Sequence, residues 1–283
     1  MTDLTTFLIN VLALGLPLVL AAMGGLISER SGIMNIALEG KLLGAACATS
    51  LVAANTGLPV LGLASGLFTA IVLSLGFVWL TQSLRLDHVV AGMAINLISI
   101  GGTNFAAKAL VDQNKLSNAP TLPLPLYYGL GGLAALLVII GFAKTRPGLH
   151  LFAVGEDPDK SRQMGLDPVR VRLGALLLTG LLCGLGGALI LTNAGGFTDG
   201  MTAGRGFIAL AAVILAGWRP GPALAVAIGF GAIEALRIQV QGTPVLGMEV
   251  PPELWSSLPY LATIIALTGL VSKSRPPAGL GRL

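Results

Sequence analysis

The stretch ERSGIMNIALEG, residues 29–40, places charged and polar side chains between two long apolar segments. Glu29 and Arg30 stand at the boundary, whereas Asn35 and Glu39 lie inside the apolar run that follows. An apolar run of about 20 residues is long enough to cross a bilayer as a helix. A polar group inside such a run is costly unless it is paired or faces a protein interior. The stretch therefore predicts a turn between two membrane helices, with polar groups directed into a helix bundle.

The whole chain has the composition of a membrane protein. Hydrophobic residues make up 54% of its 283 residues and charged residues 11%, whereas soluble domains average roughly 25% charged. A soluble helical protein would also need polar outer faces, which the apolar segments lack. The sequence predicts an all-α polytopic membrane protein with a single transmembrane domain over residues 1–283. The long apolar segments lie near 5–27, 33–54, 58–80, 88–108, 125–143, 171–193, 221–238 and 255–272, with a shorter one near 206–217.

The distribution of lysine and arginine predicts the orientation in the membrane. Basic residues are frequent in 144–172 and in the tail after 272, whereas the loop 240–254 has none. We therefore expect 144–172 and the C-terminus to be cytoplasmic and the N-terminus to be outside. For these assignments to agree, 206–217 must cross or re-enter as a short broken or tilted helix beside about eight long crossings. The basic excess reflects this loop bias, so no nucleic-acid partner is expected.

Polar residues within the apolar segments are candidates for a substrate pathway. Asn35 and Glu39 are four residues apart, which places them on one face of a predicted helix, whereas Lys41 points elsewhere and is not expected to pair with Glu39. A second set forms a stripe at helical spacing and consists of Asn96, Ser99 and Thr103. Hydrogen bonding between helices is the alternative role for both sets. A third set at helical spacing is Glu234, Arg237 and Gln241, of which Glu234 and Arg237 are interpreted as an ion pair near the membrane interface rather than as ligand groups.

No catalytic or metal-binding pattern is found in the sequence. His88 and His150 are isolated, and Cys47 and Cys183 lie in apolar runs typical of small core residues. The run EGKL at 39–42 lacks the first glycine and the final hydroxyl residue of a phosphate-binding loop. We therefore expect no cofactor in this chain, and any ATP hydrolysis has to come from a separate subunit.

Three motifs together resemble a known family. They are ERSGIMNIALEGKLLGAA, VGEDPDKSRQMGLDPVRVRLGALLLTGLLCGLGGALI and GRGFIALAAVILAGWRPGPALAVAIGFGAIEALRIQVQ, in that order, with LDHVVAGMAINLISIGGTNF as further support. They resemble the permease subunits of bacterial ABC importers, in the branch that carries branched-chain amino acids, ribose and nucleosides. The resemblance covers nearly the whole chain and is greatest to the shorter permease of purine-nucleoside or simple-sugar importers.

The resemblance implies a set of partners and a location. A second permease subunit would form a heterodimer with this chain, a cytoplasmic ABC ATPase would bind ATP and Mg²⁺, and a lipoprotein of the basic-membrane-protein type would deliver the substrate. The complex would lie in the bacterial plasma membrane and import nucleosides, with simple sugars and branched-chain amino acids as alternatives. A stand-alone secondary transporter or channel is the alternative of a different class, but it would need a coupling-ion site, and the sequence has no suitable carboxylate cluster.

The resemblance also identifies a cytoplasmic coupling helix that docks on the ATPase. Its residues are Gly155, Glu156, Asp157, Gln163, Met164, Gly165 and Leu166. Pro158 suits the first turn of a short helix, with Asp157 or Glu156 at its positive end and Gly165 stopping it after Met164. Asp159, Lys160 and Ser161 depart from the family pattern, which often has alanines there. We expect Gln163, Met164 and Leu166 to form the docking surface.

Overall fold

The computed structural model describes residues 4–109, 116, 118–241, 252–270 and 275–282, and this part of the chain is a helix bundle without β-strands. Residues 79–83 continue α3 as one turn of π-helix. The helices are α1 (Leu4–Arg30), α2 (Leu38–Thr56), α3 (Pro59–Val78), α4 (His88–Ala109), α6 (Leu124–Lys144), α7 (Arg146–Glu156), α8 (Pro158–Gln163), α9 (Pro168–Ala194), α10 (Arg205–Leu215), α11 (Pro220–Val240) and α12 (Pro252–Leu270).

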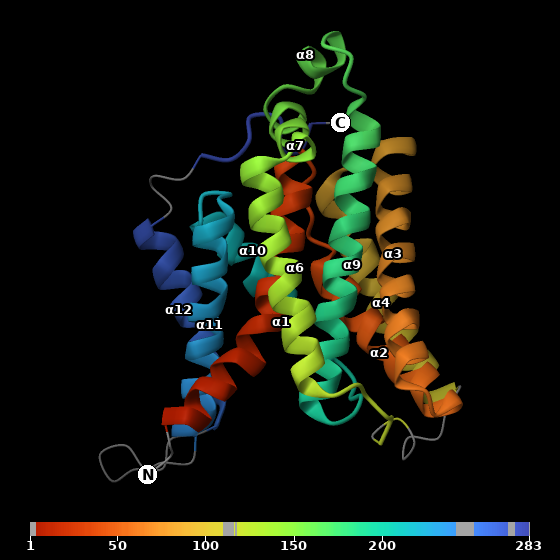
Figure 1. Cartoon of the computed structure of the whole chain (residues 1–283), viewed down its shortest axis with the longest axis vertical. Helices are drawn as coiled ribbons and strands as arrows, with labels where there is room; N and C mark the ends of the chain where they lie inside the picture. Colours follow the sequence, from red (N-terminus) through yellow and green to blue (C-terminus); the bar gives the residue numbers. More distant parts are fainter. Residues whose placement is uncertain (1–3, 110–115, 117, 242–251, 271–274, 283) are drawn as a thin grey trace.

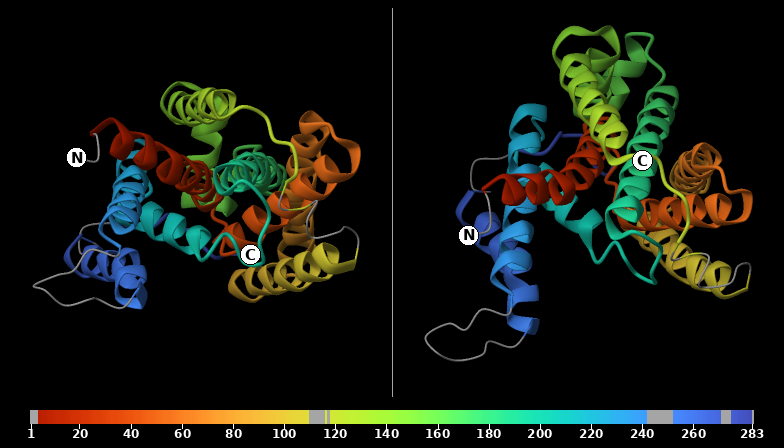
Figure 2. Two further views of the ribbon diagram at one scale, coloured as in Figure 1. Left: turned by 90° about the horizontal axis from the view of Figure 1, so that it is seen from below. Right: turned by 60° about the horizontal axis from the view of Figure 1, so that its bottom comes forward.

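The bundle is built around α1 and α9. α1 packs along α9 on one side and along α11 on the other, and its residues 17–29 are buried. α2, α3 and α4 gather on one flank, and α10, α11 and α12 on the other (Figure 2). Gly180 and Gly184 let α9 approach α3 closely, because an added Cβ would lie 2.9 Å from atoms of α3 at either position.

The two ends of the bundle carry different parts of the chain. The N-terminal end of α1 lies at one end of the molecule, whereas α7, α8 and the C-terminal residues lie at the other (Figure 1). The start of α1 and residues 275–282 thus lie at opposite ends of the molecule, and the predicted orientation in the membrane stays a prediction. Residues 242–251 of the lysine- and arginine-free loop lie outside the described residues.

Six of the described helices are long and apolar enough to cross a membrane: α1, α3 with its π-helical turn, α4, α6, α9 and α11. The predicted count of about eight crossings is therefore not confirmed. The other two expected segments form α2 and α12, each 19 residues long. The short segment predicted at 206–217 forms α10, which has 11 residues.

The chain between α1 and α2 contradicts one prediction. Residues 31–37 are not helical, Gly32 has a φ of 89°, and α2 begins only at Leu38. Ser31 Oγ donates to the Ser28 carbonyl oxygen at 2.6 Å, so a side chain bonds the backbone here in place of the helical pattern. The expectation that Asn35 shares a helix face with Glu39 is wrong, because Asn35 precedes the helix.

Candidate functional site

Glu39 joins the first turns of α2 and α10 inside the bundle. Its Oε1 accepts a hydrogen bond from the backbone N–H of Gly204 at 2.8 Å, and its Oε2 accepts one from Gly206 at 2.7 Å. These amides belong to the start of α10, where backbone donors have no helical partner and the helix dipole favours a negative charge. The carboxylate therefore fixes α10 to α2, and this contact uses both of its oxygens.

Asn96 holds the beginning of α2 from the side of α4. Its Oδ1 accepts from the N–H of Gly40 at 2.8 Å, and its Nδ2 donates to the Ile36 carbonyl oxygen at 3.0 Å. Gly40 lies so close to α4 that an added Cβ would be 2.9 Å from the Asn96 Cα. The side-chain amide thus replaces helical partners that the chain loses where α2 begins.

Ser99 and Thr103 line a cavity of about 220 Å³ between α2, α3 and α4. The buried Ser99 Oγ has no hydrogen-bond partner among the described residues. Thr103 Oγ1 donates to the Ile100 carbonyl oxygen on its own helix at 3.1 Å. The residues of the predicted polar stripe on α4 therefore have two different roles, because Asn96 stabilises the fold whereas Ser99 and Thr103 face a cavity.

Asn35 and Lys41 form a separate buried contact. Asn35 Nδ2 donates to Ser28 Oγ at 3.1 Å, and Lys41 Nζ lies 3.5 Å from Asn35 Oδ1. Lys41 is completely buried, with its Nζ 5.3 Å from the centre of the Phe77 ring. The sequence led us to expect no pair between Lys41 and Glu39, and Lys41 instead contacts Asn35. Sequence spacing did not predict this contact with the turn before its own helix.

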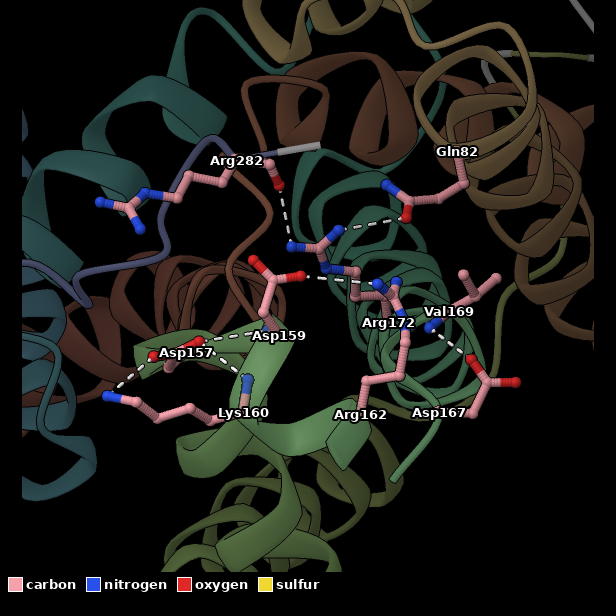
Figure 3. A network of polar contacts seen from close by, with 9 residues as sticks. All are labelled: Gln82, Asp157, Asp159, Lys160, Arg162, Asp167, Val169, Arg172 and Arg282. Carbon is pink, nitrogen blue, oxygen red and sulfur yellow. Dashed lines mark hydrogen bonds and ion pairs between the residues drawn. The ribbon is translucent and has the colours of Figure 1, made fainter. Parts of the chain in front are cut away.

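The predicted coupling segment forms the short helix α8 at the end of the molecule that carries the C-terminus (Figure 1). Asp157 caps it by accepting from the N–H groups of Asp159 at 3.2 Å and Lys160 at 3.0 Å (Figure 3). The hydrogen bond from the Lys160 backbone is the main reason why the pKa of Asp157 is lowered. Pro158 opens the helix, and Gly165 follows it with a φ of 85°. The predicted start and stop signals are confirmed.

The predicted docking residues face away from the bundle to different degrees. Gln163, Met164 and Gly165 are exposed, Met164 with 72% of its surface, and Leu166 is half-buried. At the other end of the segment, Glu156 is exposed and Gly155 is buried. An added Cβ at Gly155 would overlap the Arg30 carbonyl oxygen, so the backbones of α7 and α1 are in direct contact at this glycine. The predicted coupling segment thus has an exposed apolar end at Met164 and a buried end at Gly155, where it contacts α1.

Residues 275–282, here called the C-terminal strap, connect this segment to α1. The N–H of Gly279 donates to the Gly155 carbonyl oxygen at 2.8 Å, and the N–H of Gly281 donates to the Gly32 carbonyl oxygen at 2.9 Å. The N–H of Ala278 donates to Glu156 Oε2 at 3.3 Å, and Glu156 lies 3.8 Å from the guanidinium of Arg30. The sequence indicated only that the tail is basic. Hydrogen bonds between backbone groups leave no mark on side-chain identity, so the tail sequence did not predict these contacts.

Arg172 of α9 fastens the strap from the opposite side. Its guanidinium donates to the Arg282 carbonyl oxygen at 2.8 Å and to Gln82 Oε1 at 3.2 Å (Figure 3). It also donates to the Ser31 carbonyl oxygen at 3.3 Å. Only 3% of Arg172 is exposed. One side chain thus ties α9, the π-helical turn, the turn after α1 and the strap together, a role that sequence analysis missed because it depends on segments distant in the chain.

Among the described residues, no group of three or more His, Cys, Asp or Glu side chains is arranged to hold a metal ion. Cys47 and Cys183 are both buried and free.

Known proteins resemble the chain over almost its full length. A guanosine ABC transporter permease protein, NupQ of Bacillus subtilis, is 32% identical over 94% of this chain and 92% of its own. A nucleoside ABC transporter permease protein, NupC of Lactococcus lactis, is 31% identical over 96% and 94%. A putative glucose ABC transporter permease protein, TsgC13 of Haloferax volcanii, is 31% identical over 91% and 89%. The family model of the branched-chain amino acid transport system permease component matches residues 7–267. The chain belongs to this family of transport permeases.

Proposed function

We propose that this chain is a permease subunit of an ATP-driven importer of nucleosides in a bacterial plasma membrane. The observation that carries the proposal is the similarity, over more than nine-tenths of the chain, to permeases that act on guanosine and on nucleosides. The fold supports it, because an apolar bundle encloses polar groups and presents a short exposed helix at one end.

A simple-sugar importer is the second candidate. It is favoured by the similarity to the putative glucose permease at nearly the same identity. A ribose ring and a hexose offer similar hydroxyl groups, so side chains that accept and donate hydrogen bonds serve either substrate. The chain has few aromatic residues, at 5%, so we expect the substrate-binding lipoprotein to set most of the discrimination for an aromatic base.

In the proposed complex the ATPase contacts Gln163, Met164 and Leu166 from the cytoplasm. A second permease subunit completes the pathway, and the lipoprotein delivers substrate at the opposite end. The chain crosses the membrane with α2, α12 and the short α10 as well as the six apolar helices, and this odd number of crossings places its N-terminus outside and its C-terminus inside. The grouping of Arg30, Arg172 and Arg282 with α8 at one end supports this orientation.

Within the pathway we propose different roles for the five polar candidates. Ser99 and Thr103 line the cavity between α2, α3 and α4 and therefore suit contact with a passing solute. Glu39 and Asn96 hold the starts of α10 and α2, and Asn35 holds the turn before α2, so these three position the wall of the pathway.

Uptake of labelled nucleosides tests the proposal in a strain that lacks the ATPase, both permeases and the lipoprotein. Restoring all four genes should restore guanosine uptake, which excess unlabelled nucleoside should suppress and excess glucose should not. Competition by glucose alone would favour the sugar candidate. Uptake that persists without the ATPase gene would identify a stand-alone carrier.

A further inference from the structure

A second polar cavity lies in the other half of the bundle. It has a volume of about 220 Å³ and is lined by Leu18, Ala203, Arg205, Ile208, Phe230, Glu234, Arg237 and Pro259 of α1, α10, α11, α12 and the turn before α10. Three of these side chains are ionisable, although the cavity lies among membrane helices. Because charges are costly in this environment, their convergence on one cavity points to a function.

Two of the three charges neutralise each other. Arg237 Nη2 lies 2.7 Å from Glu234 Oε1, one turn away on α11, and both side chains are largely buried. The predicted ion pair is therefore present, and it lines the cavity together with Phe230.

Within the described part of the chain, Arg205 has no such counter-charge. Its Nη1 donates to the Met201 carbonyl oxygen at 2.8 Å, and its remaining donors have no hydrogen-bond partner among the described residues. The nearby carboxylate of Glu39 is occupied by the N–H groups of Gly204 and Gly206. A guanidinium has five donors in a planar fork, so most of the binding capacity of Arg205 is available.

Arg205 also lines a neighbouring cavity on its other side. This cavity has a volume of about 220 Å³ and includes Asn193, Thr198 and Met201 among its lining residues. The turn between them contains strained backbone, since Ala203 has a φ of 45°. Arg205 is therefore the residue that lines both cavities and lies between them.

We infer that Arg205 is a substrate-binding residue of the permeation pathway. It donates hydrogen bonds to hydroxyl and carbonyl oxygens of an uncharged polar solute, which for the proposed function are the ribose hydroxyls and base carbonyls of a nucleoside. Glu234 accepts from donor groups of the same solute, and Phe230 offers an apolar contact for its flat base. This inference rests on the proposed nucleoside import.

The test uses the complete importer reconstituted in proteoliposomes, with guanosine as the probe. Arg205→Gln should raise the KM for guanosine uptake by about tenfold, because charged hydrogen bonds to the substrate are lost. Arg205→Lys should give a smaller increase. Lys108→Gln, which removes an exposed basic group at the end of α4, is the matched control and should leave the KM unchanged.

Thiol labelling gives a second readout that does not depend on the arginine variants. Cysteines introduced at Thr198 and Ile208 place one probe in each cavity, and saturating guanosine should slow their modification at least severalfold. An unchanged KM in both arginine variants, or labelling that guanosine does not slow at either position, would overturn the inference while uptake by the wild type upheld the proposed function. If the wild type imported no nucleoside, both would fall together.

Discussion

At the scale of single residues, Glu39 shows how a membrane bundle uses a buried charge. The sequence placed this carboxylate in the membrane and left two roles open, substrate contact or a bond between helices. Its two hydrogen bonds to the first amides of α10 support the second role. The charge is balanced by backbone groups that would otherwise lack partners.

Replacing Glu39 by alanine should destabilise the protein. Two buried amides of α10 would lose their acceptor, at a cost of about 1–3 kcal/mol each. Glu39→Gln keeps one good acceptor oxygen and should lose less, so its thermal midpoint should lie between those of alanine and wild type. Thermal unfolding of the purified complex in detergent measures both. A stable Glu39→Ala protein with impaired uptake would instead place this residue in contact with substrate.

Gly206 provides a test of how closely α10 and α2 approach. An added Cβ would overlap the backbone N of Glu39, so Gly206→Ala should push the two helices apart and lower the thermal midpoint. Gly221 is the matched control, because it is also the second residue of its helix and an added Cβ there meets no atom within 4 Å. Equal stability of the two variants would show that α10 can shift without cost.

Two of the residues that hold the helix starts, Glu39 and Asn96, were visible in the sequence, but their partners were not. Glu39 and Asn96 attracted notice because polar groups are rare in apolar helices. Their bonding partners are backbone groups of Gly204, Gly206, Gly40 and Ile36, which carry no side-chain signal. Only the three-dimensional arrangement distinguishes a helix anchor from a pathway group.

At the scale of secondary-structure elements, α8 was predictable and the start of α2 was not. The signals of α8 are local, since Asp157, Pro158 and Gly165 specify its start and stop within the segment itself. The start of α2 depends on Asn96, which is 56 residues away from Gly40 in the chain. An apolar run therefore gave the helix but misplaced its first turn.

The exposed tip of α8 should be needed for coupling but not for folding. Met164→Glu places a charge on a side chain that is already in solvent, so the protein should insert and assemble with normal stability. Uptake and substrate-stimulated ATP hydrolysis should fall, and crosslinks from position 163 to the ATPase should weaken. Normal import by Met164→Glu, with no crosslink from position 163 even in the wild type, would locate the coupling site elsewhere.

The cap of α8 gives a related pH dependence. Because hydrogen bonds lower the pKa of Asp157 in the folded protein, its contribution to helix stability is complete above the ordinary pKa of about 3.9 and is lost as the pH falls through the lowered value. Asp157→Ala should remove this contribution at neutral pH and weaken the same crosslinks, whereas Asp157→Asn should retain much of the cap. Crosslinking yield at neutral and acid pH compares the three proteins.

At the scale of the whole molecule, the bias of basic residues predicted which segments share an end. Arg30, Arg172 and Arg282 are far apart in the sequence but lie together beside α8. What the bias could not supply was the number of crossings, and α2, which carries Glu39 and Lys41, is less apolar than the six helices that are apolar enough to cross.

Accessibility labelling tests the orientation with residues that the structure describes. Asn55 and Lys160 are both exposed and lie near opposite ends of the bundle. In cells, Asn55→Cys should react with a membrane-impermeant thiol reagent added from outside, and Lys160→Cys should react only after the membrane is opened. The native cysteines are buried and serve as the background. External labelling of position 160 would reverse the proposed orientation.

The C-terminal strap has a consequence for biosynthesis. Its residues follow all the described helices in the chain, so the ribosome delivers them only after the helices that they fasten have been made. Until then Arg172 lacks one of its three acceptors, and Gly155 and Gly32 lack the amides that bind them. The surface beside α8 is therefore completed only after the described helices have been made, and a chain whose translation stops before the strap cannot present it in its final form. Assembly with the ATPase would in this way be reserved for chains whose synthesis has passed the strap.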